Sequence, residues 1–218
     1  MTSGKCKPDL SKAALIVVDV QNDFLPGGAL AVPEGDEVIA PVNRLMASFD
    51  VVVLTADWHP ATHVSFAASH PGRRQFETIE LSYGTQVLWP AHCVAGTAGA
   101  QFAAALAADA ACLILRKGTH AGRDSYSGFR EAGKGASTGL AGWLRERGIE
   151  DVYVCGLALD YCVNATALDA ADAGFRTAIV VDACRAIDSG AENMRALQAL
   201  WDEAGIDCAT VDDLAAGC

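Results

Sequence analysis

Short apolar runs of strand length recur along the chain and alternate with stretches of helical periodicity. The runs are rich in Val and Ile and cover residues 13–18, 51–56, 112–115, 152–155 and 178–181, with a weaker run at 207–211. Continuous apolar runs of this kind are typical of parallel strands that are covered on both faces. The pattern predicts an α/β fold with a mostly parallel central sheet between two layers of helices.

The segments between these runs carry helical stripes. Apolar residues recur at three- and four-residue spacing over residues 38–49, 140–144 and 194–201, and we expect these stripes to pack in the core rather than contact a cofactor. Ser189 and Glu192 have the spacing of a capping box before the last stripe. No repeat, low-complexity tract or linker interrupts the pattern, so residues 1–218 are predicted to form a single domain.

Composition and charge narrow the function classes. The 218 residues are 51% hydrophobic and 20% charged, which is typical of a globular chain, and the formal net charge is −11. An acidic chain argues against a nucleic-acid or anionic-membrane partner, because both require basic surface. No apolar run is long enough to span a bilayer, and the first residues lack the apolar segment of a secretory signal. A cytoplasmic protein is expected, and a homo-oligomer stays open.

The eight cysteines are scattered, and no two have C-x-x-C spacing. A chain of this length has a core large enough not to need disulfides, so free thiols are expected. Cys112 and Cys155 lie within apolar runs and are expected to be buried and inert.

Polar residues that could take part in catalysis or ligand binding follow several of the predicted strands. Asp19, Asp57 and Lys117 lie at strand ends, and Cys162 follows the turn after the strand at 152–155. Ligands bind beyond the carboxyl ends of parallel strands, so these four residues are expected to meet at one rim. A single acid or lysine at such a place is ordinarily a turn or surface residue. Asp19, Lys117 and Cys162, which come from three different strand ends, together favour a reactive site.

Cys162 has a sequence context that favours nucleophilic sulfur. It follows an apolar strand, Gly156 and a short turn, where a helix is predicted to open. The positive end of a helix and its unpaired N–H groups favour a thiolate over a thiol. The same N–H groups suit the oxyanion that forms when sulfur attacks a carbonyl.

A metal site is predicted in a long insertion after the second strand, at about residues 57–98. Asp57 and His59 project to the same side of an extended segment, and His92 supplies a third ligand of similar hardness. The sequence does not decide whether His63 is a further metal ligand or a residue that supports the ligands. His70 and His120 are expected at the surface. The alternative is that these are ordinary loop residues. The donor set suits one divalent ion, Zn, Fe or Mn.

Five segments together resemble a known family. They are Val-Val-Asp19-Val-Gln-Asn-Asp-Phe24, Thr55-Ala-Asp57-Trp-His59-Pro, Leu88-Trp-Pro-Ala-His92-Cys-Val, Arg116-Lys117-Gly118 and Gly156-Leu-Ala-Leu-Asp-Tyr-Cys162-Val. In this order they are similar to the nicotinamidase/pyrazinamidase branch of the isochorismatase-like hydrolases. The resemblance covers most of the chain.

The resemblance implies a three-layer α/β/α fold and a metal-dependent hydrolysis of nicotinamide to nicotinate and ammonia in NAD salvage, with pyrazinamide as a further substrate. It implies a catalytic triad of Asp19, Lys117 and Cys162, and a metal held by Asp57, His59 and His92. It also suggests a cis peptide before Ala158.

On this hypothesis the reaction passes through a thioester, and the backbone N–H groups of Ala158 and Cys162 hold the oxyanion. Phe24, Leu30, Trp89 and Tyr126 are candidates for the wall around a small aromatic amide. Two alternatives stay open: a sibling amidohydrolase that acts on an acyclic amide or carbamoyl group, and a non-catalytic metal or thiol sensor.

Overall fold

A six-stranded sheet forms the centre of the computed structural model, which describes residues 8–215. Its strands follow the order β5-β2-β1-β6-β7-β8, and every neighbouring pair is parallel. The strands are β1 (Ala13–Val18), β2 (Val51–Asp57), β5 (Leu113–Lys117), β6 (Asp151–Leu157), β7 (Arg176–Arg185) and β8 (Asp207–Ala209). The prediction of a mostly parallel sheet is confirmed, and each predicted apolar run lies in or overlaps one of these strands.

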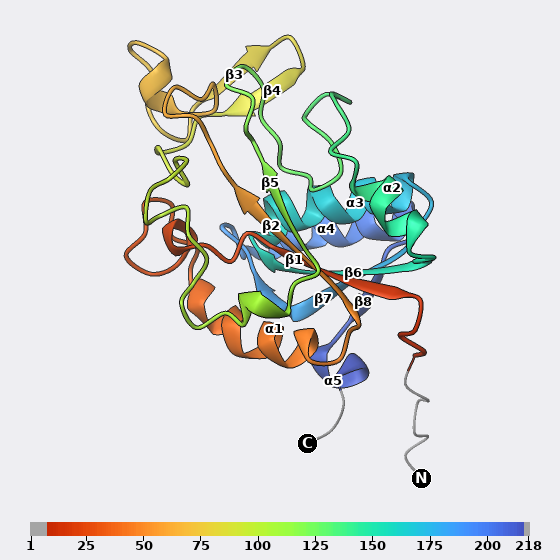
Figure 1. Ribbon diagram of the computed structural model, residues 1–218. Helices are drawn as coiled ribbons and strands as arrows, with labels where there is room; N and C mark the ends of the chain where they lie inside the picture. The colour runs from red at the N-terminus through yellow and green to blue at the C-terminus, as the bar shows by residue number, and fades with distance from the viewer. Residues whose placement is uncertain (1–7, 216–218) are drawn as a thin grey trace.

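Helices cover both faces of the sheet (Figure 1). On one face lie α2 (Leu140–Glu146), α3 (Asn164–Asp172) and α4 (Ala191–Ala204), and on the other lie α1 (Ile39–Met46) and α5 (Val211–Leu214). This is the predicted three-layer α/β/α arrangement. Among the described residues, no helix is long and apolar enough to cross a membrane.

The core is thickest around β1, the strand with β2 on one side and β6 on the other. All six of its residues are buried, because helices cover both faces of the sheet at this point. The helical stripes pack against this layer as expected, with Val42, Leu45, Leu197 and Trp201 all buried. The central strands are therefore held rigidly, and so are the residues at their carboxyl ends.

Two local predictions are wrong. The helix at 191–204 has Gly190 as its N-cap, and no side chain caps it; instead the Asp188 carboxylate accepts a hydrogen bond from the Gly190 N–H at 2.8 Å. Ser189 therefore forms no capping box with Glu192. Cys112 is exposed rather than buried, because it precedes β5, the edge strand whose residues alternate between exposed and partly covered.

The other described cysteines are free as well, including the buried Cys155, and Cys6 and Cys218 lie outside the described residues. The expectation of free thiols is thus confirmed for the described part of the chain.

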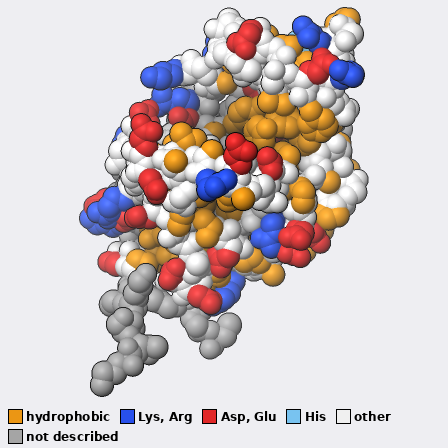
Figure 2. Space-filling view, turned by 180° about the vertical axis from the view of Figure 1, so that it is seen from behind, with side chains coloured by type: hydrophobic (Ala, Val, Ile, Leu, Met, Phe, Trp, Pro, Cys, Tyr) orange, Lys and Arg blue, Asp and Glu red, His pale blue; other side chains and the backbone are white. Residues whose placement is uncertain are grey.

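An antiparallel hairpin stands apart from the main sheet. It consists of β3 (Thr78–Leu81) and β4 (Gly84–Val87), lies within the long insertion after β2, and projects beyond the layers at the top of Figure 1. The sequence reading did not predict it, because its strands are short and partly polar. On the face shown in Figure 2, hydrophobic side chains gather in one broad area of the upper part, while basic and acidic side chains are intermixed elsewhere.

Gly156 is required where β6 passes closest to β1. Its φ is +110°, and a Cβ built there would lie 2.2 Å from the carbonyl oxygen of Val18. Only glycine combines that dihedral with that approach. The position matters for the site, because the chain reaches Cys162 directly after this point.

Gly156→Ala is therefore expected to destabilise the fold by at least about 2–3 kcal/mol, from a strained dihedral and a backbone clash. Urea denaturation measures the change. Gly142→Ala is the matched control, because Gly142 lies in α2 with nothing within 4 Å of its added Cβ, and alanine favours a helix. Equal stabilities for the two variants would contradict the account of Gly156.

Candidate active site and metal centre

Three side chains predicted to react lie together at the carboxyl ends of the strands. Asp19 follows β1, Lys117 ends β5, and Cys162 lies in a turn of π-helix (Leu159–Val163) that leads from β6 into α3. All three are buried. The Lys117 Nζ atom lies 2.7 Å from Asp19 Oδ2 and 3.3 Å from Cys162 Sγ. The structure brings these residues into contact, as the strand-end argument predicted.

The Lys117 ammonium group contacts most of the polar groups of the site. Besides Asp19 and Cys162, its ammonium group contacts Asp57 Oδ1 at 2.5 Å and donates to the carbonyl oxygen of Ser125 at 3.1 Å. Burial lowers the pKa of Lys117, but Asp19 and Asp57 together outweigh burial and raise this pKa well above its usual value. Lys117 is therefore a permanent buried cation.

Asp19 is arranged as a proton acceptor. Its backbone has a φ of +49°, and its Oδ1 accepts a hydrogen bond from the Thr55 hydroxyl at 2.6 Å. Its Oδ2 is in ionic contact with Lys117, yet within residues 8–215 it accepts no hydrogen bond of good geometry. Burial raises the pKa of Asp19, and Lys117 opposes the rise. A carboxylate oxygen of Asp19 lies within 4.8 Å of the Cys162 sulfur.

Cys162 differs from the expectation of a resting thiolate. Burial raises the pKa of its thiol well above the usual value, and the nearby Lys117 only partly offsets this. The helix start lies here as predicted, but complete burial next to two carboxylates outweighs its effect. A thiol with a raised pKa needs a base to become nucleophilic, and Asp19 is the residue predicted for that role.

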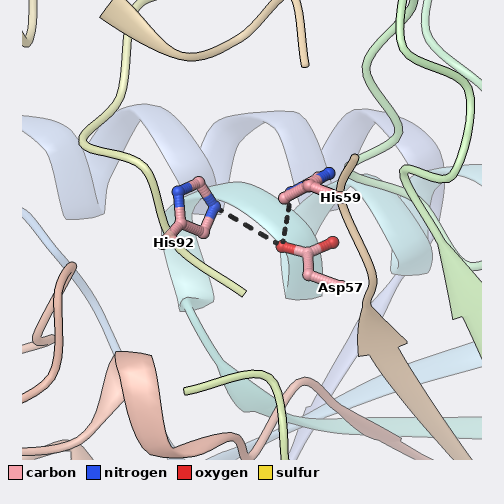
Figure 3. A group of neighbouring side chains, drawn as sticks. All are labelled: Asp57, His59 and His92. Carbon is pink, nitrogen blue, oxygen red and sulfur yellow. Dashed lines mark ion pairs between the residues drawn. The ribbon is translucent and has the colours of Figure 1, made fainter. Parts of the chain in front are cut away.

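A second cluster lies next to the first and shares Asp57. Figure 3 shows the side chains of Asp57, His59 and His92 pointing at one another. Asp57 Oδ2 lies 3.5 Å from His59 Nε2 and 3.8 Å from His92 Nε2. All three residues are buried. The structure thus brings together the three predicted metal ligands.

The hydrogen bonds of the two histidines suit a metal. His59 Nδ1 bonds to the carbonyl oxygen of Gly118 at 2.9 Å, and His92 Nδ1 bonds to that of Pro90 at 2.8 Å. A carbonyl oxygen only accepts, so each Nδ1 carries a hydrogen, and each Nε2 faces Asp57 Oδ2, where a neutral ring would offer its lone pair to a metal. Gly118 permits the first contact, since a Cβ there would lie 2.3 Å from the His59 ring.

Charge also favours a cation at this place. The carboxyl groups of Asp19, Asp57 and Asp124 are buried with one ammonium group, that of Lys117. A buried region that holds more carboxyl groups than ammonium groups favours a cation. Burial raises the pKa of Asp57, but Lys117 and His59 outweigh it and hold this pKa well below its usual range. Asp57 is therefore available as a charged ligand.

His63 has both ring nitrogens engaged. Its Nδ1 lies 2.7 Å from the Ser65 hydroxyl, and its Nε2 lies 3.1 Å from the carbonyl oxygen of Arg123. Burial, and then the neighbouring His59, lower the pKa of His63 to about 4, so the ring is neutral. It stacks on His59 with 4.2 Å between ring centroids. This arrangement favours a supporting role, although His59, His63 and Asp124 form a second group of closely spaced donor atoms.

The remaining histidines lie outside these clusters. His120 is exposed as predicted, and the partly buried His70 bonds through Nε2 to the carbonyl oxygen of Val64.

A pocket opens onto both clusters. Its lining includes the four predicted wall residues Phe24, Leu30, Trp89 and Tyr126, and also Ala158, Tyr161, Ile187 and Asp124. The indole N–H of Trp89 donates to the Tyr126 hydroxyl at 2.9 Å, and the Trp89 and Tyr161 rings meet edge to face. An aromatic lining around a thiol and a metal-ligand set suits a flat aromatic ring.

Ala158 and Cys162 both line the pocket, and the peptide between Leu157 and Ala158 is cis, as the resemblance suggested. The role of these two residues in an oxyanion hole stays a prediction.

Sequence reasoning missed several residues that shape the site. Gln21 holds the backbone of Asp57, Thr55 holds Asp19, and Asp124 adds a buried carboxyl group to the pocket. Gln21 and Thr55 lie within the motifs, but nothing in their spacing shows where their side chains point. Asp124 lies in a loop without periodicity.

Comparison with known proteins agrees with this geometry. Residues 13–213 match the profile of the isochorismatase domain. The chain is 52% identical to a nicotinamidase of Acinetobacter baylyi over 193 residues, which is 88% of each chain.

Two solved structures are similar throughout. A nicotinamidase and pyrazinamidase of Acinetobacter baumanii matches with a TM-score of 0.90 and 51% identity, over 94% of this chain and 98% of that one. A pyrazinamidase of Pyrococcus horikoshii in complex with zinc matches with a TM-score of 0.74 and 38% identity, over 91% and 99%.

His59→Ala is expected to abolish binding of a stoichiometric divalent ion, because it removes one of three ligands in a buried set. Metal analysis of the purified protein measures the loss. His120→Ala is the control, since this histidine is exposed and belongs to none of the groups of closely spaced donor atoms. Unchanged metal content in His59→Ala would exclude His59 as a ligand.

Proposed function

The chain belongs to the isochorismatase domain family, and from this premise we propose that it is a cysteine amidohydrolase that converts nicotinamide to nicotinate and ammonia, a step of NAD salvage. The observation that carries the proposal is the contact of Lys117 with Asp19, Cys162 and Asp57, which joins a thiol and its base to a metal-ligand set. The similarity to a nicotinamidase and pyrazinamidase supports pyrazinamide as a further substrate.

In the first half of the reaction, Asp19 Oδ2 takes the proton of the Cys162 thiol as the sulfur attacks the carboxamide carbon. Lys117 stabilises the negative charge that passes from sulfur to substrate. The backbone N–H groups of Ala158 and Cys162 are assigned to the oxyanion of the tetrahedral intermediate. Asp19 then gives its proton to the departing nitrogen, so that ammonia leaves and a thioester remains.

In the second half, Asp19 takes a proton from water as the water oxygen attacks the thioester carbon. The second tetrahedral intermediate collapses with release of the Cys162 sulfur, which regains a proton from Asp19. Nicotinate leaves as the product. The raised pKa of Asp19 suits a group that both accepts and donates a proton in each half.

Asp57, His59 and His92 would hold the divalent cation, and their free Nε2 and Oδ2 atoms fit this role. The chemistry that the cation supplies when bound is Lewis acidity toward the ring nitrogen, which orients the carboxamide toward Cys162. We infer zinc as the ion from the zinc complex of the similar pyrazinamidase, while this donor set also suits iron or manganese.

The pocket distinguishes this function from its alternatives. An acyclic amide or carbamoyl substrate would need neither an aromatic lining nor a ring-binding cation, and this pocket has an aromatic lining and a set of candidate metal ligands. A non-catalytic sensor would not need Asp19 with a free lone pair beside the thiol. Ammonia release from nicotinamide, pyrazinamide and acyclic amides, with and without a chelator, tests all three.

Cys162→Ala is expected to lower ammonia release from nicotinamide by at least about 10⁴-fold, because the nucleophile is lost. Metal content is expected to stay unchanged, since Cys162 is not among the three ligands. Cys208→Ala, at an exposed cysteine, is the control. Normal turnover by Cys162→Ala would refute the mechanism.

Thr55→Val is expected to move the acid limb of the pH profile of kcat/KM to higher pH. The Thr55 hydroxyl lowers the pKa of Asp19 by a hydrogen bond to its charged form, so an isosteric Val lets that pKa rise further. Activity requires the deprotonated Asp19 and is lost as pH falls through its pKa, so the loss begins at a higher pH. The shift is expected to be about one pH unit or less.

The profile is measured with the metal-loaded enzyme and nicotinamide. Thr177→Val is the control. It removes a buried hydroxyl of β7 that donates to the Phe175 carbonyl, and it is expected to keep the parental pH profile. A limb that does not move in Thr55→Val would separate Asp19 from the proton transfer.

A further inference from the structure

Gln21 is fully buried and lies two residues beyond Asp19, where the main chain has left the sheet. The ladder between β1 and β2 ends at Asp19, whose N–H donates to the Thr55 carbonyl at 3.3 Å. The main chain of residues 20–22 then pairs with residues 101–103 in the antiparallel sense. On the side of β2 that faces β1, the main chain of Asp57 is therefore left without a strand partner.

The side chain of Gln21 takes the place of the missing strand partner. Its Oε1 accepts a hydrogen bond from the Asp57 N–H at 2.8 Å, and its Nε2 donates to the Asp57 carbonyl at 2.8 Å. A second hydrogen on Nε2 is donated to the carbonyl of Ala100 at 2.9 Å. A side-chain amide offers the donor and acceptor of a peptide group, so it continues the ladder for one residue more.

Asp57 needs such support because its two oxygens serve two different centres. Oδ1 contacts Lys117, while Oδ2 faces His59 and His92. On the other side Asp57 is aligned with Lys117 of β5. A small rotation of the Asp57 backbone would move Oδ2 away from the two imidazoles, since Lys117 holds Oδ1 in place.

We propose that Gln21 is a positioning residue that sets the affinity of the Asp57–His59–His92 site for its divalent cation. It acts through the backbone of Asp57 and touches neither the cation nor the substrate. The proposal rests on the metal site of the proposed function. On this proposal a residue just beyond β1, outside the ligand set, helps to determine how tightly the enzyme binds its metal.

Other side chains would not replace Gln21. Asn is one methylene shorter and would not span from residue 21 to both groups of Asp57. Met has a similar length but leaves the buried N–H and C=O of Asp57 without partners. Glu keeps an acceptor for the Asp57 N–H but turns a second oxygen toward the carbonyls of Asp57 and Ala100, where a donor is needed.

The test measures Zn²⁺ affinity of the full-length protein by competition with a chelator, after metal removal. Gln21→Met and Gln21→Glu are both expected to raise the Zn²⁺ dissociation constant by about 10- to 100-fold, the effect of losing a residue that orients a metal ligand. In Gln21→Glu the added negative charge would by itself tighten cation binding. A weaker affinity therefore reports lost positioning rather than charge.

Gln101→Glu is the matched control. Gln101 is exposed on the segment that pairs with residues 20–22, so the variant adds the same charge nearby without touching Asp57. Its Zn²⁺ affinity is expected to stay within about twofold of the parent, well below the loss expected at Gln21.

Two further readouts separate positioning from a general loss of stability. Zn²⁺ is expected to raise the melting temperature of the Gln21 variants less than that of the parent at equal concentration. Their kcat is expected to recover toward the parental value at saturating Zn²⁺, with half-activation at a higher Zn²⁺ concentration. A merely structural role would lower the melting temperature of the metal-free protein and leave the dissociation constant unchanged.

The outcomes are distinct. Gln21 variants that bind Zn²⁺ with parental affinity, while His59→Ala binds none, would overturn the inference and leave the proposed function intact. A parent protein that binds no Zn²⁺ and hydrolyses nicotinamide equally well with a chelator would overturn both. If Gln21→Met does not fold and Gln21→Glu binds Zn²⁺ with parental affinity, the role of Gln21 at the metal site is likewise overturned.

Discussion

The buried ammonium group of Lys117 is the constraint on which the rest of the site depends. A fully buried charge is costly unless opposite charges and hydrogen bonds surround it, and removing one partner of such a group costs about 3–5 kcal/mol. Here the partners are Asp19, Asp57, the Ser125 carbonyl and the Cys162 sulfur. Each partner belongs to a different segment, so satisfying one charge fixes four segments relative to one another.

Strand order explains how the Lys117 side chain reaches three of these partners, Asp57, Asp19 and Cys162. Lys117, Asp57, Asp19 and Cys162 lie at or beyond the ends of β5, β2, β1 and β6, which are consecutive in the sheet. Each step across the sheet is about 4.8 Å. The long side chain of Lys117 extends from the edge strand over the end of β2 and meets the shorter Asp19 side chain above β1. A parallel sheet places all these ends at one rim, and a mixed sheet would not.

Much of this arrangement is readable in the sequence, because burial on both faces leaves continuous apolar runs and the residue after each run lies at the rim. Asp19, Asp57, Lys117 and Cys162 were predicted to meet at the rim in this way, while His59 and His92 were predicted as ligands from their spacing in the insertion. Side-chain direction was not readable: Gln21 and Thr55 act through geometry that depends on where the main chain turns at Asp19. The β3–β4 hairpin left no clear signal because its strands are short and partly polar. The exposure of Cys112 depends on which strand forms the edge of the sheet, and local periodicity does not reveal strand order.

Asp57 connects the two halves of the chemistry. One of its oxygens balances the charge of Lys117, and the other faces the two histidines. Whatever displaces this carboxylate therefore disturbs both centres, since Lys117 would lose a counter-charge and the histidines would lose their third donor. Its backbone is accordingly held on both sides, by β5 and by the amide of Gln21. The residue whose two oxygens serve two centres is thus held through its main chain by partners on both sides.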